Sequence, residues 1–323
     1  NRIRRTFRSG QESLVEQYRY TAGNRLMSVE RLCGVGVSEG ADIHADMPGI
    51  RKESFTYDKQ GNLLSDGQAT YTYDAFNRME RAELKDGRTQ INHYDAEGLR
   101  AEMEENGRLV KFLFNPDKEV VAEESEGTII RYIRGLGLIS SDSEKAKTYY
   151  HYVTDELGSI THITDEDGEI LNRYEYDVYG NFTHKEETIE NRFGFTGEQY
   201  DPVTNLYYLR ARFYSPAIGR FIQEDTYYGD GLNLYTYCHN NPVTYVDPSG
   251  NVCIKKYQNY KQQGYSGVEA GIKAKYDELK RTQGADAAQK YLDNQVAGLK
   301  NKGYEFSDTW KSNDSGGNFG FTA

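Results

Sequence analysis

Aromatic and polar residues alternate over short stretches of the chain, and each stretch ends in the same kind of turn. Phe-Thr-Tyr-Asp at 55–58 is followed by Gly-Asn-Leu at 61–63, and Tyr-Thr-Tyr-Asp at 71–74 by Asn-Arg-Met at 77–79. Two further copies contain Tyr94-Asp95 and Tyr176-Asp177, and a degenerate copy lies at 18–24. Alternation with a period of two predicts β-strands whose rings lie on one face of a sheet.

The turn residues predict hairpins. An aspartate after the tyrosine can accept hydrogen bonds from backbone amides two residues on, and the glycine or asparagine that follows tolerates a positive φ. Asp-Gly at 86–87 and 167–168 and Asn-Gly at 106–107 are further turn signals. We therefore predict a mainly β fold, an extended antiparallel sheet of repeated hairpins. Such a sheet is expected to curl or to continue into further repeats, because unpaired strand edges promote aggregation.

Three stretches depart from this pattern. Small and polar residues predict loops at 31–50 and 140–147. After residue 250, apolar residues recur at helical spacing, and the two sets are Val268, Ile272, Tyr276 and Leu279, then Ala288, Leu292, Val296 and Leu299. This spacing predicts a small helical hairpin in the C-terminal tail.

Composition favours thin, half-exposed sheets. The 323 residues include 28 tyrosines but only 13 phenylalanines and one tryptophan, and tyrosine can bury its ring while its hydroxyl stays at water. Residues 1–250 carry 28 basic and 42 acidic side chains, whereas residues 251–323 carry 11 and 8. The acidic balance argues against a nucleic-acid-binding face in residues 1–250. The net charge is therefore negative before residue 250 and positive after it, which marks a junction near that residue.

The cysteines and histidines give no recognisable site in the sequence. Cys33, Cys238 and Cys253 are spaced neither like a zinc site nor like a disulfide framework, and we interpret them as semi-buried free thiols. The six histidines do not cluster and none follows His239, so we predict no metal site and no cofactor. No apolar run is long enough to cross a membrane. Because the chain begins inside a repeat, we expect any export signal upstream of Asn1.

Residues 193–250 form the most distinctive segment. Its motifs are Phe-Gly-Phe-Thr-Gly at 193–197, Leu-Tyr-Tyr-Leu-Arg-Ala-Arg-Phe-Tyr-Ser-Pro at 206–216, Gly-Arg-Phe-Ile at 219–222, Asn-Asn-Pro-Val at 240–243 and Asp-Pro-Ser-Gly at 247–250. This segment resembles the Rhs repeat-associated core domain, and the residues before it resemble the YD repeats of the same family. The resemblance divides the chain into YD/Rhs repeats at 1–186, the core domain at 187–250 and a variable C-terminal tail at 251–323.

The resemblance implies a partial Rhs shell closed by the core domain, which in many members cuts the chain just after the Asp-Pro-x-Gly element. The family's cleavage residues are an arginine and two aspartates. Carried over motif by motif, they fall on Arg212, Asp225 and Asp247, with Gly250 and Asn251 as the cleavage region. Two neighbouring carboxylates do not both ionise easily, so one can activate water while the other donates a proton. A guanidinium can hold one carboxylate ionised or clamp the chain.

A purely structural interpretation of the same residues is that the Asp-Pro element is a turn, Asp225 caps another turn and Arg212 is an ion-pair partner. Two residues depart from the family's pattern. Asn251 stands where many self-cleaving members have an apolar residue, and Thr226 stands where proline is common. Both changes leave the carboxylates in place, and both leave open whether the bond near Asn251 is cut.

We therefore expect the C-terminal part of an Rhs-type, secreted or cell-surface, bacterial toxin-delivery shell that serves bacterial competition. Autoproteolysis of the aspartyl type near residue 250 would release the tail, and no metabolic activity is indicated. The expected partners are the chain's own enclosed tail, a secretion machinery or target-cell surface, and an immunity protein. The alternative is a non-catalytic surface module for adhesion or carbohydrate binding. The tail contains no histidine and is short for a complete toxin, and its residues do not indicate an activity.

Overall fold

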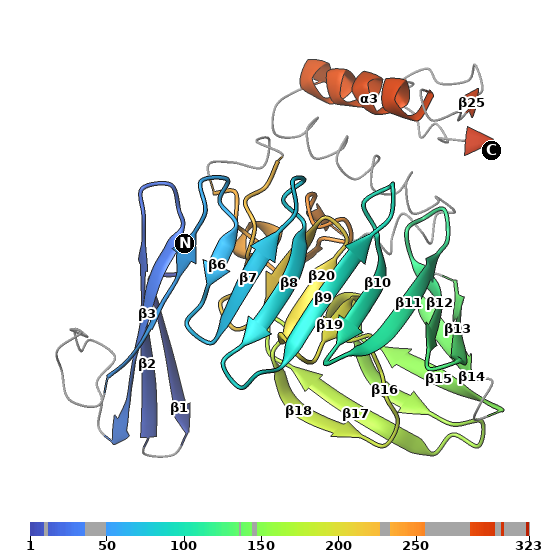
Figure 1. The fold of residues 1–323 in the computed structure, drawn as a ribbon, viewed down its shortest axis with the longest axis horizontal. Coiled ribbons are helices and arrows are strands. Elements are labelled where there is room, and N and C mark those ends of the chain that lie inside the picture. The colour runs from blue at the N-terminus through green and yellow to red at the C-terminus, as the bar shows by residue number, and fades with distance from the viewer. Residues whose placement is uncertain are drawn as a thin grey trace.

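Antiparallel strands joined by short turns make up most of the described chain, as the alternating pattern predicts. The computed structural model describes residues 1–9, 12–35, 50–135, 137–143, 147–226, 233–255, 285–300, 305–306 and 321–322. Within these ranges the strands form one sheet of 14 strands, two sheets of four strands and two pairs of short strands. The fold class is therefore mainly β, with curled antiparallel sheets, as expected (Figure 1).

The first sheet has the order β1-β2-β3-β4. Its strands are β1 (Arg4–Ser9), β2 (Glu12–Tyr20), β3 (Leu26–Val35) and β4 (Arg51–Ser54). The long sheet follows with every strand paired to its neighbours in sequence. Its strands are β5 (Thr56–Tyr57), β6 (Leu63–Ser65), β7 (Ala69–Tyr73), β8 (Met79–Leu84), β9 (Thr89–Tyr94), β10 (Arg100–Glu105), β11 (Arg108–Phe114), β12 (Val120–Ser125), β13 (Thr128–Arg134), β14 (Leu138–Ser143), β15 (Thr148–Thr154), β16 (Ile160–Thr164), β17 (Ile170–Tyr176) and β18 (Phe182–Glu187).

The aspartate of the repeat closes the hairpin turn, as its position after the tyrosine predicts. Asp74 Oδ1 accepts hydrogen bonds from the backbone amides of Phe76 at 2.8 Å and Arg78 at 2.9 Å. Asn77 between them adopts a φ of 62°, a conformation that asparagine tolerates better than most residues. The same carboxylate-to-amide pattern recurs at Asp95, Asp155, Asp165 and Asp177. Local chemistry therefore fixes the hairpin geometry.

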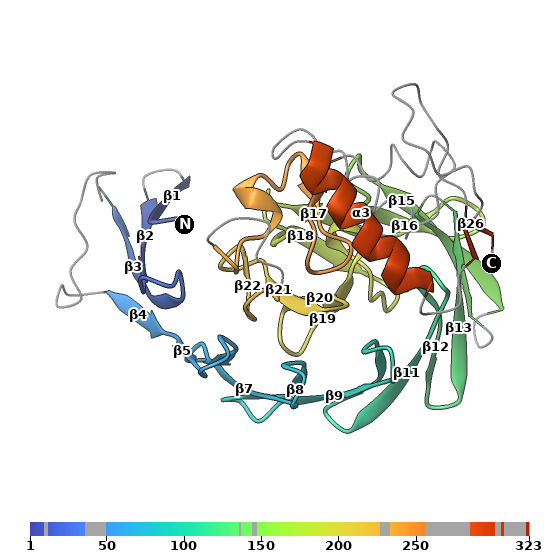
Figure 2. The same ribbon diagram turned by 90° about the horizontal axis from the view of Figure 1, so that it is seen from above.

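A second four-stranded sheet lies inside the curl of the long sheet. Its strands are β19 (Gln199–Asp201), β20 (Leu206–Leu209), β21 (Arg212–Ser215) and β22 (Arg220–Phe221). Figure 2 shows β5 to β13 following an arc, with β19 to β22 on its concave side and β15 to β18 returning behind them. We call the long sheet the wall and β19 to β22 the core sheet.

Short elements complete the described structure. They are the 3₁₀ turns η1 (Phe195–Gly197) and η3 (Cys238–Asn240), the strand pairs β23 (Tyr245–Val246) with β24 (Ile254–Lys255) and β25 (Glu305–Phe306) with β26 (Phe321–Thr322), and the helix α3 (Ala285–Lys300). The helix α3 lies across one end of the curled wall in both views (Figures 1 and 2). No helix in the described part of the chain is long and apolar enough to span a lipid bilayer.

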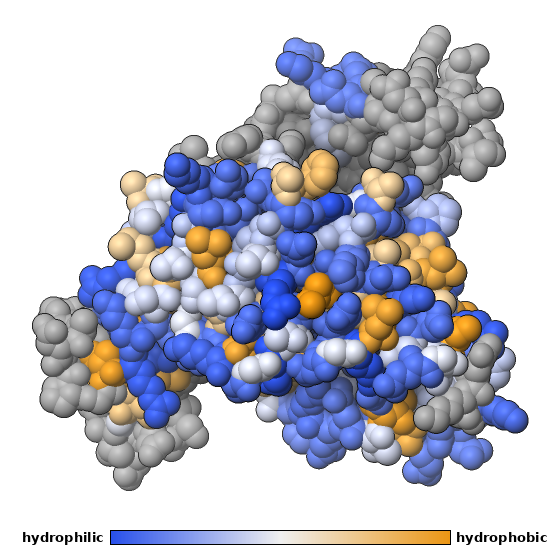
Figure 3. All heavy atoms as spheres, viewed as in Figure 1, coloured by the Kyte–Doolittle hydropathy of each residue, from blue (hydrophilic) through white to orange (hydrophobic). Residues whose placement is uncertain are grey.

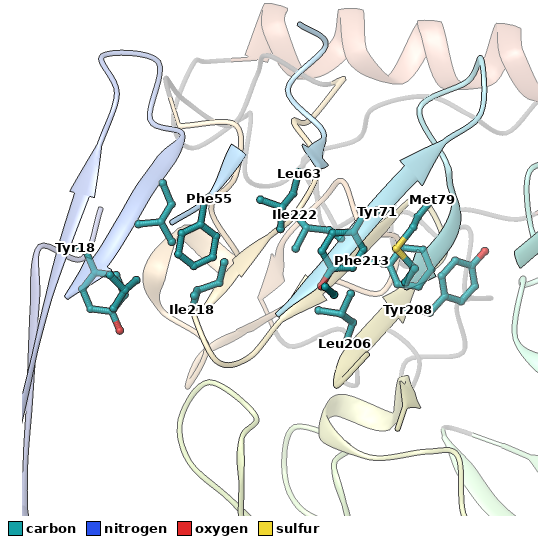
Figure 4. Close-up of a cluster of buried hydrophobic side chains, with 14 residues drawn as sticks. Tyr18, Phe55, Leu63, Tyr71, Met79, Leu206, Tyr208, Phe213, Ile218 and Ile222 are labelled. Atoms are coloured by element: carbon teal, nitrogen blue, oxygen red, sulfur yellow. The ribbon is translucent and has the colours of Figure 1, made fainter. Parts of the chain in front are cut away.

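The core sheet is buried on both faces, so all four residues of β20, Leu206–Leu209, are buried. Leu206, Tyr208 and Phe213 share one buried cluster with wall residues such as Tyr71 and Met79 (Figure 4). The opposite face forms a second cluster, whose members include Tyr207, Leu209, Tyr214, Phe221 and Tyr237. Burying one such large side chain contributes about 1.5–3 kcal/mol relative to leaving it exposed. In both clusters, side chains of the wall pack against side chains of the core sheet.

Several tyrosines of the repeats contribute their rings to these buried clusters. Tyr18, Tyr71 and Tyr174 are buried, and Tyr57 and Tyr73 pack against the same cluster as Tyr71. Their rings therefore fill the space on the concave side and do not form a sugar-stacking surface. The outer surface in Figure 3 is mostly hydrophilic, with apolar side chains scattered over it.

One buried ion pair links the wall to the core sheet. Arg100 on β10 and Asp201 on β19 are both fully buried, and their side chains meet at 2.5 and 3.0 Å in a two-pronged contact. Gln90 donates to the same carboxylate at 2.8 Å. The hydroxyl of Tyr208 accepts a hydrogen bond from the backbone amide of Arg100 at 2.9 Å. This network sets the position of the core sheet against the wall.

Both predicted loops are wrong in part. Residues 31–35 belong to β3, whose Arg31 lies opposite Glu16 in the register and pairs with it at 2.6 Å. Residues 140–143 belong to β14, where Ser141 is buried and shares a hydrogen bond with the Tyr152 hydroxyl at 3.2 Å. In both places a neighbouring strand supplies hydrogen-bonding or ion-pair partners for the polar residues. A polar composition therefore predicted a loop where the chain forms a strand. Residues 36–49 and 144–146 lie outside the described residues.

The predicted helical tail is confirmed for its second helix. Helix α3 spans the positions of the second apolar set, and Leu292 within it is buried. The first predicted helix, around Val268 to Leu279, lies outside the described residues.

Candidate active site

Arg212 occupies the centre of a buried site at the end of the core sheet. It is the first residue of β21, directly after the tight turn that joins β20 to β21, and its side chain is only 5% exposed. The guanidinium carbon lies 3.7 Å from the centre of the Phe221 ring on the neighbouring strand β22. A cation stacked on an aromatic face at this distance is stabilised and held in orientation.

The guanidinium of Arg212 contacts each segment on which the sequence predicts a site residue. One terminal nitrogen lies 2.7 Å from Asp225 Oδ2 and 3.9 Å from Asp247 Oδ2. The other terminal nitrogen donates to the carbonyl of Leu234 at 3.0 Å. Its Nε donates to the carbonyl oxygen of Gly250. The three predicted catalytic residues, spread over 36 positions of sequence, thus meet around one side chain.

Asp225 is placed by a strand-like pairing next to the core sheet. Its backbone amide donates to the carbonyl of Leu234 at 3.0 Å, and the amide of Phe221 donates to the carbonyl of Tyr235 at 3.0 Å. The residue is 7% exposed. Its carboxylate therefore faces Arg212 in a nearly dry environment, where the guanidinium stabilises its negative charge.

Asp247 is enclosed by the backbone that follows it. Its Oδ1 accepts hydrogen bonds from the amides of Ser249, Gly250 and Val252 at 3.2, 2.8 and 3.1 Å, and from the Ser249 hydroxyl at 3.1 Å. The Asp-Pro element is thus a turn, as the structural interpretation proposed, and the same turn wraps around the site. Within the described structure, Oδ2 is buried and makes no hydrogen bond.

The burial of Asp247 changes its acidity. The residue is 2% exposed. Burial raises the pKa of the Asp247 carboxyl above its usual value, an effect that the nearby Arg212 and the surrounding amides only partly offset. A carboxyl with a raised pKa keeps its proton to higher pH and can serve as a proton donor.

Gly250 brings the chain into contact with the turn between β20 and β21. Its φ is 75°, and a Cβ atom at this position would lie 2.3 Å from the carbonyl oxygen of Leu209. The amide of Ala211 also donates to the carbonyl of Ser249 at 3.2 Å. Only glycine fits this close approach. The peptide after Gly250 is therefore held against the strand that carries Arg212.

Asn251 adds a second donor to the Gly250 carbonyl. With its side-chain nitrogen oriented toward the surrounding oxygens, Asn251 donates to Gly250 O at 3.0 Å and to Asp225 Oδ1 at 3.3 Å. Its backbone amide donates to the Ser249 hydroxyl at 3.2 Å. The asparagine that departs from the family's apolar pattern thus joins one catalytic candidate to the predicted cleavage region. Sequence reasoning missed Ser249 and this contact, because serine occupies the variable position of the Asp-Pro-x-Gly element.

The site combines three features needed to hydrolyse a peptide bond. It contains a carboxylate paired with a guanidinium, a buried carboxyl with a raised pKa, and a carbonyl oxygen that accepts two hydrogen bonds. Donors aimed at a carbonyl oxygen stabilise the negative charge that develops there during nucleophilic attack. In the described part of the chain, no group of three or more His, Cys, Asp or Glu side chains could hold a metal ion.

A curled wall of tyrosine/aspartate hairpins around a buried core sheet defines a YD-shell protein. The family model of the teneurin YD-shell matches residues 3–243. The chain therefore belongs to this family, as its resemblance to YD-repeat and Rhs proteins implied.

Related bacterial proteins include two that are named tRNA nucleases and one that is named a toxin. The chain is 35% identical over 259 residues to the tRNA3(Ser)-specific nuclease WapA of Bacillus spizizenii, a match that covers 75% of this chain and 11% of that protein. It is 32% identical over 310 residues to the tRNA nuclease WapA of Bacillus subtilis strain 168, covering 87% of this chain and 13% of the relative. The toxin protein Tse5 of Pseudomonas aeruginosa is 27% identical over 208 residues, covering 57% and 15% of the two chains.

Solved structures share the fold. The crystal structure of TcdB2-TccC3 superposes with a TM-score of 0.52 at 17% identity, covering 74% of this chain and 14% of that chain. The chain spans only about a tenth to a seventh of the length of these relatives.

Proposed function

We propose that this chain is the C-terminal part of a toxin-delivery shell, and that its core segment cuts the chain between Gly250 and Asn251. The observation that carries the proposal is the Gly250 carbonyl, which accepts a hydrogen bond from Arg212 inside a site that contains both aspartates. The domain division at 186/187 and 250/251 belongs to the same proposal.

In the proposed reaction, Asp225 acts as the general base. Its carboxylate, ionised beside Arg212 at 2.7 Å, takes a proton from a water molecule. The water oxygen bonds to the carbonyl carbon of Gly250, and the negative charge on the carbonyl oxygen is stabilised by Arg212 Nε and the Asn251 side chain.

Asp247 acts as the general acid. Its carboxyl lies among the amides of Gly250 and Val252, which flank the bond to be cut. It donates a proton to the Asn251 nitrogen as that bond breaks. The products are a carboxyl group on Gly250 and a new amino terminus at Asn251. The raised pKa of Asp247 keeps this carboxyl protonated, so that it can donate its proton.

The relatives support a role in toxin delivery. Two of them are named tRNA nucleases and a third is named a toxin. We propose that residues 251–323 are the start or the whole of a cargo segment, which the complete shell encloses. The whole protein would act outside the cell or at its surface, exported by a signal upstream of this chain, with a target-cell surface and an immunity protein as partners.

Refolding tests whether the chain cuts itself. The chain is purified in denaturant, diluted into buffer at several protein concentrations, and followed on denaturing gels under reducing conditions. We expect a fragment of residues 251–323 to accumulate with a first-order rate that does not depend on protein concentration. A chain that refolds, as judged by circular dichroism, and remains intact would contradict the proposal, and a rate proportional to concentration would point to a contaminating protease.

The pH dependence of cleavage follows from Asp247. An acid catalyst is active while protonated, so the rate is expected to fall as pH rises through the raised pKa of Asp247. The measurement is the first-order rate constant across a pH series on refolded chain. A rate that keeps rising into the alkaline range would exclude Asp247 as the acid.

A further inference from the structure

Two cysteines lie in the second buried cluster, on the face of the core sheet that carries Tyr207. In the sequence, one precedes and one follows the bond proposed to be cleaved. Cys238 is fully buried and Cys253 is 5% exposed, and both belong to the cluster that contains Tyr207 and Tyr237. The Cys253 side chain lies within hydrogen-bonding reach of the Cys238 thiol and helps to raise its pKa. The third cysteine, Cys33, is exposed on β3. In sequence, Cys238 precedes the Gly250–Asn251 bond and Cys253 follows it by two residues.

The local fold holds the two cysteines together. Cys238 opens the turn η3 with a φ of 48°, a left-handed conformation that is uncommon for a residue with a Cβ atom. The chain then turns into β23, with the amide of Tyr245 donating to the carbonyl of Asn241 at 3.2 Å. Strand β24 pairs back onto β23 with Val246 opposite Ile254. Cys253, directly before β24, is thereby returned to the turn that carries Cys238.

We propose that Cys238 and Cys253 form a disulfide that keeps residues 251–323 attached to the core after cleavage, and that reduction releases them. The bond itself requires only the observed contact, whereas its tethering role rests on the proposed cleavage. The fifteen-residue separation fits neither a zinc site nor a repeated cysteine framework, so the pair is recognised only in the folded chain.

The oxidation uses a low-molecular-weight disulfide as oxidant. One cysteine loses its proton and attacks the oxidant, which forms a mixed disulfide and releases one small thiol. The second cysteine loses its proton and attacks the mixed disulfide, which forms the Cys238–Cys253 bond and releases the second small thiol. Two electrons and two protons thus pass from the protein to the oxidant. Such bonds persist in oxidising compartments and are reduced in the cytosol.

Burial determines when this reaction takes place. Burial raises the pKa of the Cys238 thiol well above its usual value, so little reactive thiolate is present in the folded chain. Oxidation is therefore expected during folding, before the β23–β24 pair closes over the cysteines. The same burial protects the finished bond from reductants until this region opens. A cut chain would keep its cargo while outside a cell and lose it in a reducing cytosol.

Folding in a glutathione redox buffer tests the proposal. The folded chain is denatured with an alkylating reagent, digested without reductant and analysed by mass spectrometry. We expect the peptide, or the linked pair of peptides, that contains Cys238 and Cys253 to be two hydrogens lighter than its reduced form, with Cys33 alkylated. Alkylation of both Cys238 and Cys253 after oxidative folding would overturn the disulfide. This readout does not depend on whether the chain is cut.

Denaturing gels run with and without reductant distinguish the proposed disulfide from the proposed cleavage. If both proposals hold, the two fragments migrate together without reductant and apart with it. Cys238→Ser and Cys253→Ser are expected to lose this linkage, whereas the control Cys33→Ser keeps it. Fragments that separate without reductant would overturn the tether while leaving the cleavage intact. An uncut chain with the linked peptide would overturn the cleavage alone. If a serine variant fails to fold, the wild-type peptide analysis still decides.

Discussion

Replacing Asp247 or Asp225 with asparagine is expected to slow self-cleavage by about 10²- to 10⁴-fold, the range that general acid–base catalysis contributes. Asparagine at 247 can still accept hydrogen bonds from the amides of Gly250 and Val252, so the turn is retained, but it has no acidic proton to donate. Asparagine at 225 keeps the size of the side chain and removes the base. The rates are measured on refolded chain by densitometry of denaturing gels.

A matched control is available in the repeats. Asp165 caps an exposed hairpin with the same carboxylate-to-amide bonds, to the amides of Asp167 and Glu169. Asp165→Asn is therefore expected to leave the cleavage rate within a factor of two or so, since surface substitutions are usually close to neutral. Wild-type rates in both Asp225→Asn and Asp247→Asn would remove these residues from the mechanism.

The Asp247 variant also has a distinct effect on stability. Because burial raises the pKa of Asp247, the wild-type fold is most stable while this carboxyl is protonated, and it loses stability as pH rises through the raised pKa. Asp247→Asn has no such titration. Its thermal unfolding temperature is therefore expected to fall less than that of the wild type as pH rises through this pKa.

Removing Arg100 is expected to destabilise the chain by about 3–5 kcal/mol, the loss measured when one partner of a buried ion pair is removed. Arg100→Met would leave the Asp201 carboxylate fully buried with only Gln90 as a hydrogen-bonding partner among the contacts described above. It would also remove the buried ion pair that joins the wall to the core sheet. Chemical denaturation followed by circular dichroism gives the free energy of unfolding.

A second ion pair provides the control for this experiment. Arg108 on β11 contacts Glu190 through two nitrogens at 3.1 Å each, but the glutamate side chain is 79% exposed. Exposed pairs contribute roughly 0.2–1 kcal/mol, so Arg108→Met should change stability far less than Arg100→Met. Equal losses in the two variants would show that the Arg100–Asp201 pair does not fix the core sheet in the wall.

The hairpins could be predicted from the sequence because their determinants are local. The period of two places rings on one face, and an aspartate such as Asp74 reaches amides only two and four residues away. The ends of β3 and β14 could not be predicted, because polar residues such as Ser141 obtain their partners from a neighbouring strand.

The site was predictable only in its residue types and motifs. Arg212, Asp225 and Asp247 were identified because they fall in recognisable motifs, and the structure brings them together. Their chemistry depends on burial and on contacts from distant segments, which the sequence does not reveal. The same holds for the Arg100–Asp201 pair, whose members are 101 residues apart, and for the contact between Cys238 and Cys253. Such contacts arise from packing of the core sheet against the wall.

The mass of the folded chain under reducing conditions tests the central claim most directly. Self-cleavage predicts two species, residues 1–250 and residues 251–323, whose masses together exceed that of the uncut chain by one water molecule. An unchanged mass of 36.9 kDa from a chain with a native β-sheet spectrum would contradict the account. Fragments that end at any bond other than Gly250–Asn251 would contradict the assignment of the Gly250 carbonyl as the site of attack.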